Sequence, residues 1–357
     1  MNTIIRLFNL TIISLPLFLL CGATASAQYA EGLKTDQPLF ATHDVMTVRI
    51  EAPLSTLTKK RSDEEYLDGM FHYIDSSGET QTLDLKIRTR GKFRLQKSTC
   101  KFPPIRLNFK TGQVKDSEFA AQDKLKLVSH CQGRGSFEQL ILREYLAYRM
   151  YQALTDKSFG ARLMRISYVD TEDDDDTLVR YGFVIEDDDN IGARLGLSRA
   201  TIRRIKVAEL DPKLANLVAV YLYMIGNTDY SLILGPPDDE CCHNAMLYSA
   251  GSAPYAPIPY DFDFSGIVNA PYAEPSPQLK LRNVKSRLYR GRCVNNALLD
   301  GTIAYFIEKE GELRGLIDGL EGLDERNKKD VAKYMDGFYK DIKNPKVVER
   351  NFIKKCL

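Results

Sequence analysis

The chain has 357 residues, of which 49 are lysine or arginine and 48 are aspartate or glutamate, so its formal net charge is +1. This balance argues against a general nucleic-acid-binding protein, because such proteins neutralise many phosphates with an excess of cations. The length suffices for one bilobal domain or for two smaller domains.

The first residues have the pattern of a secretory signal peptide. A short basic start at Met1–Arg6 is followed by the apolar run Leu7–Leu20 and by Ala25–Ala27, a small-x-small cleavage site. The apolar run is too short to cross about 30 Å of hydrocarbon. Cys21 leaves a lipoprotein as the alternative, but the residue before it is a leucine where a small residue is expected. We therefore expect a signal peptide over residues 1–27, a periplasmic or secreted mature protein and no stable membrane insertion after cleavage.

The mature chain keeps an even number of cysteines, which favours disulfide bonds in an exported protein. They are Cys100, Cys131, Cys241, Cys242, Cys293 and Cys356. We expect Cys100 and Cys131 to bond across neighbouring strands, and Cys293 or Cys356 to tie the helical tail to the body. The adjacent Cys241 and Cys242 are expected to have different partners. A zinc site is the weaker alternative, because thiols lie beside histidines but no C-x₂-C pair occurs.

The first part of the mature chain alternates apolar and polar residues, which predicts β-strands. The expected strands are Met46–Ile50, Gly69–Ile74, Leu83–Arg88, Ile105–Phe109 and Lys124–Val128. An amphipathic helix of about five turns is predicted next, with Ser136 as its N-cap and Gln139 three residues on. Strands are expected again at Leu163–Val169 and Val179–Glu186. The acidic run Glu172–Asp176 between them fits a solvated hairpin tip, with a metal site as the alternative.

A cluster of cations follows the third predicted strand. Arg88–Arg94 carries four of them around Gly91, which is a plausible clamp for an anionic ligand. Glu144, on the predicted helix, is expected to orient a strand lysine such as Lys126 or Lys101 towards phosphates. The candidate nucleotide-binding residues are Arg90, Arg94, Lys101, Lys126 and Glu144. The alternatives are a solvated basic hairpin and an exposed helical glutamate.

The second half of the chain is predicted to be mainly helical. A helix is expected from Pro212 to Ile225 with Asp211 as its N-cap. Three more are expected at Asn296–Gly311, Leu313–Leu320 and Asp324–Ile342. The order gives a β-rich N-terminal lobe with one major helix over residues 28–205, and a helical C-terminal lobe carrying the acidic site over residues 206–357. A cleft between two such parts is a natural ligand site.

Four polar residues lie at the ends of apolar elements in the second half. Asp229 follows the predicted helix, Asn244 precedes the apolar run Ala245–Tyr248, and Asp261 and Asp263 close a second apolar run. Asn244, Asp261 and Asp263 are candidate ligands for Mg²⁺ or Mn²⁺, because hard cations prefer carboxylate and amide oxygens. Asp229 is the candidate catalytic base for a substrate hydroxyl. Taken singly, each residue could equally be a cap or a turn former.

Several segments together resemble the CotH kinase family, over roughly residues 80–270. They are Arg-x-Arg-Gly-x-x-Arg at 88–94, Lys-Leu-Lys-Leu-Val-Ser at 124–129, Leu-Arg-Glu-Tyr-Leu-Ala-Tyr-Arg-Met at 142–150, Gly-Asn-Thr-Asp-Tyr at 226–230, His-Asn at 243–244 and Tyr-Asp-Phe-Asp at 260–263. The resemblance implies an α+β, bilobal protein-kinase-like fold and transfer of phosphate from ATP to protein Ser or Thr with Mg²⁺ or Mn²⁺. It also implies that Asp229 is the catalytic residue and that Asn244 and Asp261 hold metal.

The sequence is therefore compatible with three functions. The first is a secreted CotH-like kinase that acts on a protein substrate. The second is a non-catalytic, pseudokinase-like protein that binds or assembles components of the envelope or the extracellular space. The third is a metal-dependent hydrolase that uses the same acidic residues. The expected response to ATP and a divalent metal separates the first from the second, because only a kinase turns ATP over.

Overall fold

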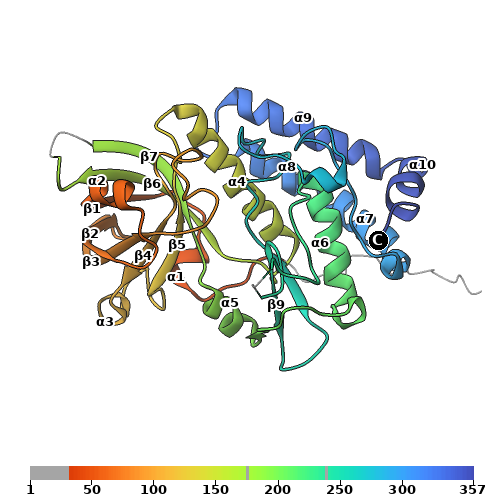
Figure 1. The fold of residues 1–357 in the computed structure, drawn as a ribbon, viewed down its shortest axis with the longest axis horizontal. Helices are drawn as coiled ribbons and strands as arrows, with labels where there is room; N and C mark the ends of the chain where they lie inside the picture. Colours follow the sequence, from red (N-terminus) through yellow and green to blue (C-terminus); the bar gives the residue numbers. More distant parts are fainter. Residues whose placement is uncertain (1–31, 174–176, 238–239) are drawn as a thin grey trace, which may run out of the picture.

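The structure is a computed structural model that describes residues 32–173, 177–237 and 240–357. The predicted signal peptide lies outside these residues, and so does the part of the acidic run at 174–176. A strand-rich part forms one end of the molecule and a helical part forms the other, as Figure 1 shows.

Seven strands close into a barrel, in the order β1-β2-β3-β4-β5-β7-β6. They are β1 Met46–Ala52, β2 Leu67–Ile74, β3 Thr80–Thr89, β4 Ile105–Phe109, β5 Lys124–Val128, β6 Ala161–Asp170 and β7 Thr177–Ile185. All neighbouring pairs are antiparallel except β1 and β6, which run parallel and bring Val48 opposite Ile166. The predicted strands are confirmed, most of them with longer ends.

The predicted bilobal protein-kinase-like fold is wrong. Its N-terminal lobe would be an open sheet, whereas here the pairing of β1 with β6 closes the sheet into a mixed barrel and leaves the helices elsewhere. The alternation of apolar residues identified the strands but did not show which strands lie at the edges. Closure joins residues more than a hundred positions apart, and periodicity carries no information about such pairings.

The barrel core is mainly aliphatic and contains a cluster of four aromatic side chains. Phe119 lies on the loop before β5 and packs against the rings of Phe71 and Tyr73, with ring centroids 5.1 and 5.0 Å apart. Phe71 also contacts Phe109 edge to face at 5.3 Å. All four side chains are buried. Such rings bury a large apolar area, so this barrel is a packed core and not an open channel.

The helices pack in two places: the short helices α1, α2 and α3 add buried side chains to the barrel core, and the helices from α4 onward form a second core beside it. The helices are α1 Pro38–Ala41, α2 Leu54–Lys60, α3 Thr111–Val114, α4 Gly135–Leu154, α5 Asp188–Leu195, α6 Pro212–Ile225, α7 Leu299–Glu308, α8 Glu310–Asp318, α9 Glu325–Ile342 and α10 Pro345–Val348. Helix α4 contacts β6 and β7 on one side and α8 on the other, so it joins the two cores (Figure 1). Within the described ranges, no helix combines the length and apolar character needed to cross a membrane.

The two predicted N-caps can be compared with the observed starts of α6 and α4. The Asp211 side chain accepts a hydrogen bond from the Leu214 N–H at 2.9 Å, and α6 then runs to Ile225, as predicted. Gly226 ends α6 with φ of 67°, a conformation that suits glycine. The predicted N-cap of α4 is wrong, because the helix begins at Gly135 and places Ser136 in its first turn.

A small sheet positions the polar residues of the second half. It has the order β10-β9-β8, with β8 at Ser198–Arg199, β9 at Ala245–Ser249 and β10 at Ala256–Pro259. Asn244 directly precedes β9 and Asp261 follows β10, and these two strands are antiparallel neighbours. The start of one strand and the end of its antiparallel neighbour lie at the same edge of a sheet. The fold therefore brings Asn244 and Asp261 together, as the sequence predicted.

All six described cysteines form disulfides, which is consistent with an exported protein. The predicted bond between Cys100 and Cys131 is confirmed. Cys293 bonds to Cys356, so it ties the end of the chain to the segment before α7. The expectation that Cys241 and Cys242 have different partners is wrong, because the other four cysteines pair among themselves and these two bond to each other. No thiol of the six remains for zinc.

Candidate functional site

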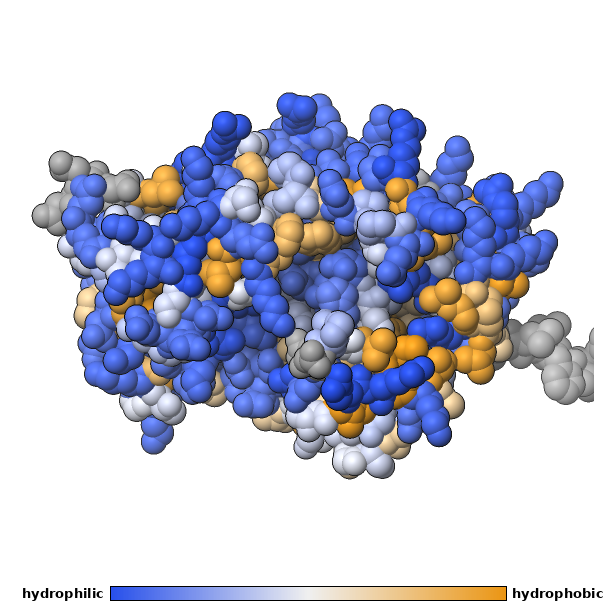
Figure 2. Space-filling model, in the orientation of Figure 1, coloured by the Kyte–Doolittle hydropathy of each residue, from blue (hydrophilic) through white to orange (hydrophobic). Residues whose placement is uncertain are grey.

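A pocket of about 440 Å³ lies where the loop after β3 faces the edge of the small sheet. Figure 2 shows that the face in view is hollowed near its centre and is bordered mainly by hydrophilic side chains. The lining residues are Arg90, Gly91, Lys92, Phe93, Arg94, Pro104, Arg199, Asp229, Pro236, Glu240, Cys241, Cys242, His243, Asn244, Ala245, Met246, Tyr260, Asp261, Asp263 and Phe264. The pocket is therefore built from segments that lie up to 174 positions apart in the sequence.

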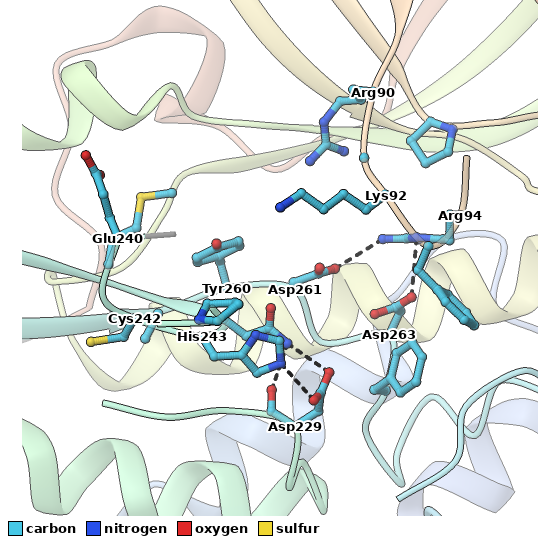
Figure 3. Close-up of a pocket in the computed structure, with 18 of the residues that line it drawn as sticks. Arg90, Lys92, Arg94, Asp229, Glu240, Cys242, His243, Tyr260, Asp261 and Asp263 are labelled. Carbon is cyan, nitrogen blue, oxygen red and sulfur yellow. Dashed lines mark hydrogen bonds and ion pairs between the residues drawn. The ribbon is translucent and has the colours of Figure 1, made fainter. Parts of the chain in front are cut away.

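The basic side of the pocket is the turn around Gly91. Gly91 has φ of 87°, which favours glycine, and the N–H of Arg90 donates to the carbonyl of Pro104 at 3.0 Å. Arg90 and Lys92 extend from this turn into the pocket (Figure 3). Burial lowers the pKa of Arg90, and the charge of Asp261 opposes that effect. A partly desolvated guanidinium that faces an open pocket favours an anionic ligand.

Arg94 also lines the pocket, and its guanidinium lies among three carboxylates. Its guanidinium contacts Glu144 of α4 at 3.0 and 3.2 Å, Asp261 at 3.3 Å and Asp263 at 3.3 Å. Burial disfavours the charge of Arg94, but these carboxylates outweigh burial and raise its pKa. The predicted pairing of Glu144 with a lysine is therefore wrong. Arg94 comes closer to Glu144 because the turn at Gly91 directs the chain back onto α4.

Two of these carboxylates are not interchangeable. The Asp263 side chain is only 6 % exposed and also accepts a hydrogen bond from Tyr272 Oη at 3.1 Å, whereas the Asp261 side chain is 43 % exposed. Burial raises the pKa of Asp263, and the neighbouring charges of Asp261 and Glu144 add to the rise while Arg94 opposes it. Asp261 therefore has the more accessible carboxylate, whereas the Asp263 carboxylate is buried against Arg94.

On the opposite wall, Asp229 is held by its neighbours. Its N–H donates to Asn227 Oδ1 at 2.8 Å, and Asn244 Nδ2 donates to its carbonyl at 2.7 Å and to its Oδ2 at 3.0 Å. His243 Nε2 lies 2.8 Å from Asp229 Oδ1. The loop between them folds back because Ser231 N–H donates to the His243 carbonyl at 3.0 Å. Asp229 is thus fixed in position with its carboxylate at the pocket wall (Figure 3).

Two residues face the pocket with an unusual backbone. Asn244 has φ of 53° and Asp261 has φ of 60°, in the left-handed region. Asparagine and aspartate adopt this region more readily than other residues that carry a Cβ, but the conformation still costs on the order of 1 kcal/mol. Asp261 is held there by its N–H, which donates to Tyr148 Oη of α4 at 2.9 Å. Strained residues of this kind cluster at ligand sites, which supports a functional reading of both.

Three predicted nucleotide-binding residues lie outside the pocket lining, namely Glu144, which contacts Arg94, and the two lysines Lys101 and Lys126. Lys101 is exposed, and its carbonyl accepts a hydrogen bond from Arg61. Lys126 is bonded to Asp188 at the start of α5, and its Nζ lies 5.9 Å from the ring centroid of Tyr260, which lines the pocket. Lys126 therefore lies next to a lining residue but does not itself line the pocket.

Sequence reasoning missed the role of His243. The contact of His243 with Asp229 was not predicted, although the His-Asn pair at 243–244 places an imidazole next to a candidate ligand. Arg199 and Glu240 were also missed, and both line the pocket and contact each other at 3.0 Å. Arg199 belongs to β8, a strand of two residues that is too short to give a periodic signal.

With this geometry established, the chain can be compared with known proteins. No family model, curated protein or solved structure matches it. The function must therefore be argued from the pocket itself.

The contact between His243 and Asp229 gives a pH-dependent prediction. The hydrogen bond to Asp229 raises the pKa of His243, burial opposes the rise, and the charge of Asp229 adds to it. The contact therefore stabilises the fold fully below the unfolded-state pKa of about 6.5, and this stabilisation is lost as the pH rises through the higher folded-state value. In Asp229→Asn we expect His243 to titrate at lower pH than in the wild type, which an NMR titration of the imidazole signals measures. His72 is the internal control, and an unchanged His243 titration would contradict the pairing.

Proposed function

We propose that this protein is an exported phosphotransferase that transfers the terminal phosphoryl group of ATP to a hydroxyl group of a protein substrate. The observation that carries the proposal is the meeting, in one pocket, of a basic turn, a fixed carboxylate and a more exposed acidic residue. Phosphoryl transfer requires these three parts: cations for the phosphates, oxygen ligands for metal and an acceptor for a proton. The proposed activity is the one that the resemblance to CotH kinases implies, although the fold differs from the one that the resemblance implies.

In this proposal the phosphate-binding cations and the proton acceptor lie on opposite walls of the pocket. Arg90 and Lys92 bind the phosphate oxygens from the side of the barrel. Asp229 accepts the hydroxyl proton as the acceptor oxygen bonds to the terminal phosphorus, the bond from that phosphorus to the bridging oxygen breaks, and ADP leaves. Asn244 and His243 keep the Asp229 carboxylate oriented towards the acceptor. Fixed orientation of the reacting groups removes an entropic part of the barrier.

The residues fit a divalent cation that completes its shell with phosphate oxygens and water. No group of three His, Cys, Asp or Glu ligands occurs in the part of the chain that the structure describes. Mg²⁺ needs only one or two carboxylates besides substrate phosphates, however, and Asp261 and Asn244 Oδ1 are suitably placed. Glu144, Asp261 and Asp263 share one guanidinium, so when all three are ionised the group has a formal charge of −2. A bound Mg²⁺ or Mn²⁺ would neutralise charge on the phosphates.

The proposal is tested by binding. With ATP and Mg²⁺ or Mn²⁺ at about 100 times the dissociation constant, the free energy of unfolding should rise by about 2.7 kcal/mol, which thermal denaturation detects. Asp261→Asn is expected to remove the metal-dependent part of this shift, because few protein ligands hold the ion. Asp116→Asn is the matched control, since it removes the same charge from an exposed residue of the barrel region. A wild-type protein that gives no shift with ATP and either metal would overturn the proposal.

A second candidate is a nucleotide-binding protein without catalysis, which serves as a binding or assembly component of the envelope. The observation in its favour is that Arg94 contacts both Asp261 and Asp263, so part of the acidic site is already neutralised. Turnover separates the two candidates. The catalytic protein converts bound ATP to ADP and phosphorylates a hydroxyl, whereas the binding protein gives the thermal shift alone.

A further inference from the structure

The segment that follows the acidic residues is strongly basic. Between Glu274 and Asp300 the sequence contains no acidic residue, yet it carries the cations Lys280, Arg282, Lys285, Arg287, Arg290 and Arg292. We call residues 280–292 the basic segment. Arg287 is partly buried and donates to the carbonyls of Tyr223, Met224 and Tyr334, so it serves the fold. The other five cations make no ion pair within the described residues.

The basic segment is connected to elements around the pocket, although none of residues 280–292 is among the lining residues. Upstream of it, Tyr272 packs against Phe264 and Phe93 of the lining, with ring centroids 5.9 and 5.7 Å apart. At its other end, Arg290 Nη1 donates to the carbonyls of Thr228 and Tyr230, both at 2.7 Å. These two carbonyls flank Asp229. The basic segment is thus attached directly to the loop that carries the proposed base.

Arg290 and Arg292, at the end of the segment, lie close together and both line a small cavity beside Tyr230. The Arg290 guanidinium lies 4.9 Å from the centroid of the Tyr230 ring. Burial lowers the pKa of Arg292, and the like charge of Arg290 lowers it further. Unpaired cations that repel each other favour an anionic partner, which would remove the repulsion.

The middle of the segment is exposed but anchored. Gly266, which follows the acidic residues of the pocket, approaches Lys285 so closely that a Cβ at position 266 would lie 3.0 Å from the Lys285 Cα. The Lys285 carbonyl also accepts a hydrogen bond from Tyr334 Oη of α9 at 3.1 Å. The side chains of Lys280, Arg282 and Lys285 nevertheless face solvent. A fixed backbone with exposed cations loses little entropy when it binds a charged partner.

We propose that the basic segment is the docking surface for the acceptor, and that the acceptor is a peptide segment rich in aspartate and glutamate around its hydroxyl residue. The role as acceptor rests on the proposed function, whereas the binding of acidic peptides does not. The surface would hold the acidic flanks of the peptide beside Asp229 while the nucleotide occupies the pocket. Its attraction is electrostatic, so affinity should fall as the salt concentration rises.

The test compares two serine peptides of equal length, one flanked by glutamates and one flanked by lysines. Binding is measured by fluorescence anisotropy, and transfer by incorporation of labelled phosphate from ATP. The triple variant Lys280→Ser, Arg282→Ser and Lys285→Ser is expected to weaken binding of the acidic peptide, and to raise its KM, on the order of tenfold, as the loss of three exposed ion pairs implies. The variant Lys59→Ser, Lys60→Ser and Lys115→Ser is the control, because it removes the same charge from exposed residues outside the segment.

Each outcome decides the proposal. Preference for the acidic peptide, lost in the first variant and kept in the control, supports it. Equal affinity for an oligothymidylate of similar charge, preference for the lysine peptide or an unaffected first variant would overturn the docking surface. If the acidic peptide binds through the segment but receives no phosphate, although the protein phosphorylates the lysine-flanked peptide, the acceptor role is overturned. A thermal shift with ATP and metal but transfer to neither peptide identifies the non-catalytic binding protein and so a failure of the proposed phosphotransferase function. Absence of both the shift and transfer, with peptide binding intact, also identifies a failure of the proposed phosphotransferase function.

Discussion

Asp229→Asn is expected to lower the rate of phosphoryl transfer by about 10²- to 10⁴-fold, the usual contribution of a positioned general base. The amide has nearly the same shape as the carboxylate but cannot accept the hydroxyl proton. Its oxygen can still accept the hydrogen bond from Asn244 that the carboxylate receives at 3.0 Å, so the loop should keep its conformation. The rate is measured in single turnover with saturating ATP and metal.

Nucleotide binding provides the control for this variant. Asp229 lies on the wall opposite Arg90 and Lys92, so the thermal shift with ATP and metal should remain close to that of the wild type. His243→Gln should lower the rate less, because it leaves the proton acceptor in place and weakens only its orientation. If Asp229→Asn turns over as fast as the wild type, Asp229 is not the base.

Arg94→Met is expected to lower the free energy of unfolding by about 3–5 kcal/mol, the usual cost of removing one partner from a buried ionic group. The guanidinium is 9 % exposed and contacts Glu144 and Asp263, which are themselves buried. Without it both carboxylates would be buried with no cation beside them. The sequence placed Arg94 among the candidate nucleotide-binding residues, whereas its burial among carboxylates gives it a role in stability. Denaturation in guanidinium chloride measures the change.

The response to pH identifies the cause of this instability. In Arg94→Met the unpaired carboxylates have folded-state pKa values above their unfolded-state values, so they destabilise the protein more as the pH rises and become neutral as it falls. The difference from the wild type should therefore shrink at low pH. Arg94→Lys should recover only part of the stability, since an ammonium cannot form the two parallel contacts that the guanidinium makes with Glu144. A stable Arg94→Met protein would show that this ionic group contributes little to the fold.

The sequence by itself determined the local features. Alternation identified the strands, and Ile105–Phe109 and Lys124–Val128 match their predicted bounds. The cap at Asp211 and the glycine after Ile225 set both ends of α6, and so the position from which the Asp229 loop starts. These signals are readable because periodicity, capping and chain reversal act between residues only a few positions apart. The acidic residues could be named for the same reason, since each ends an apolar element.

Only the tertiary structure decided which distant groups meet. The parallel pairing of β1 with β6 closes the barrel, and the turn at Gly91 gives Glu144 an arginine partner in place of the expected lysine. His243 reaches Asp229 because an irregular loop folds back on itself, and Arg290 reaches the same loop from 60 residues away. Pairings of this kind depend on the packing of whole elements, which no local pattern records. The sequence shows which charged residues could form pairs, but their burial and separation in the fold determine which pairs form.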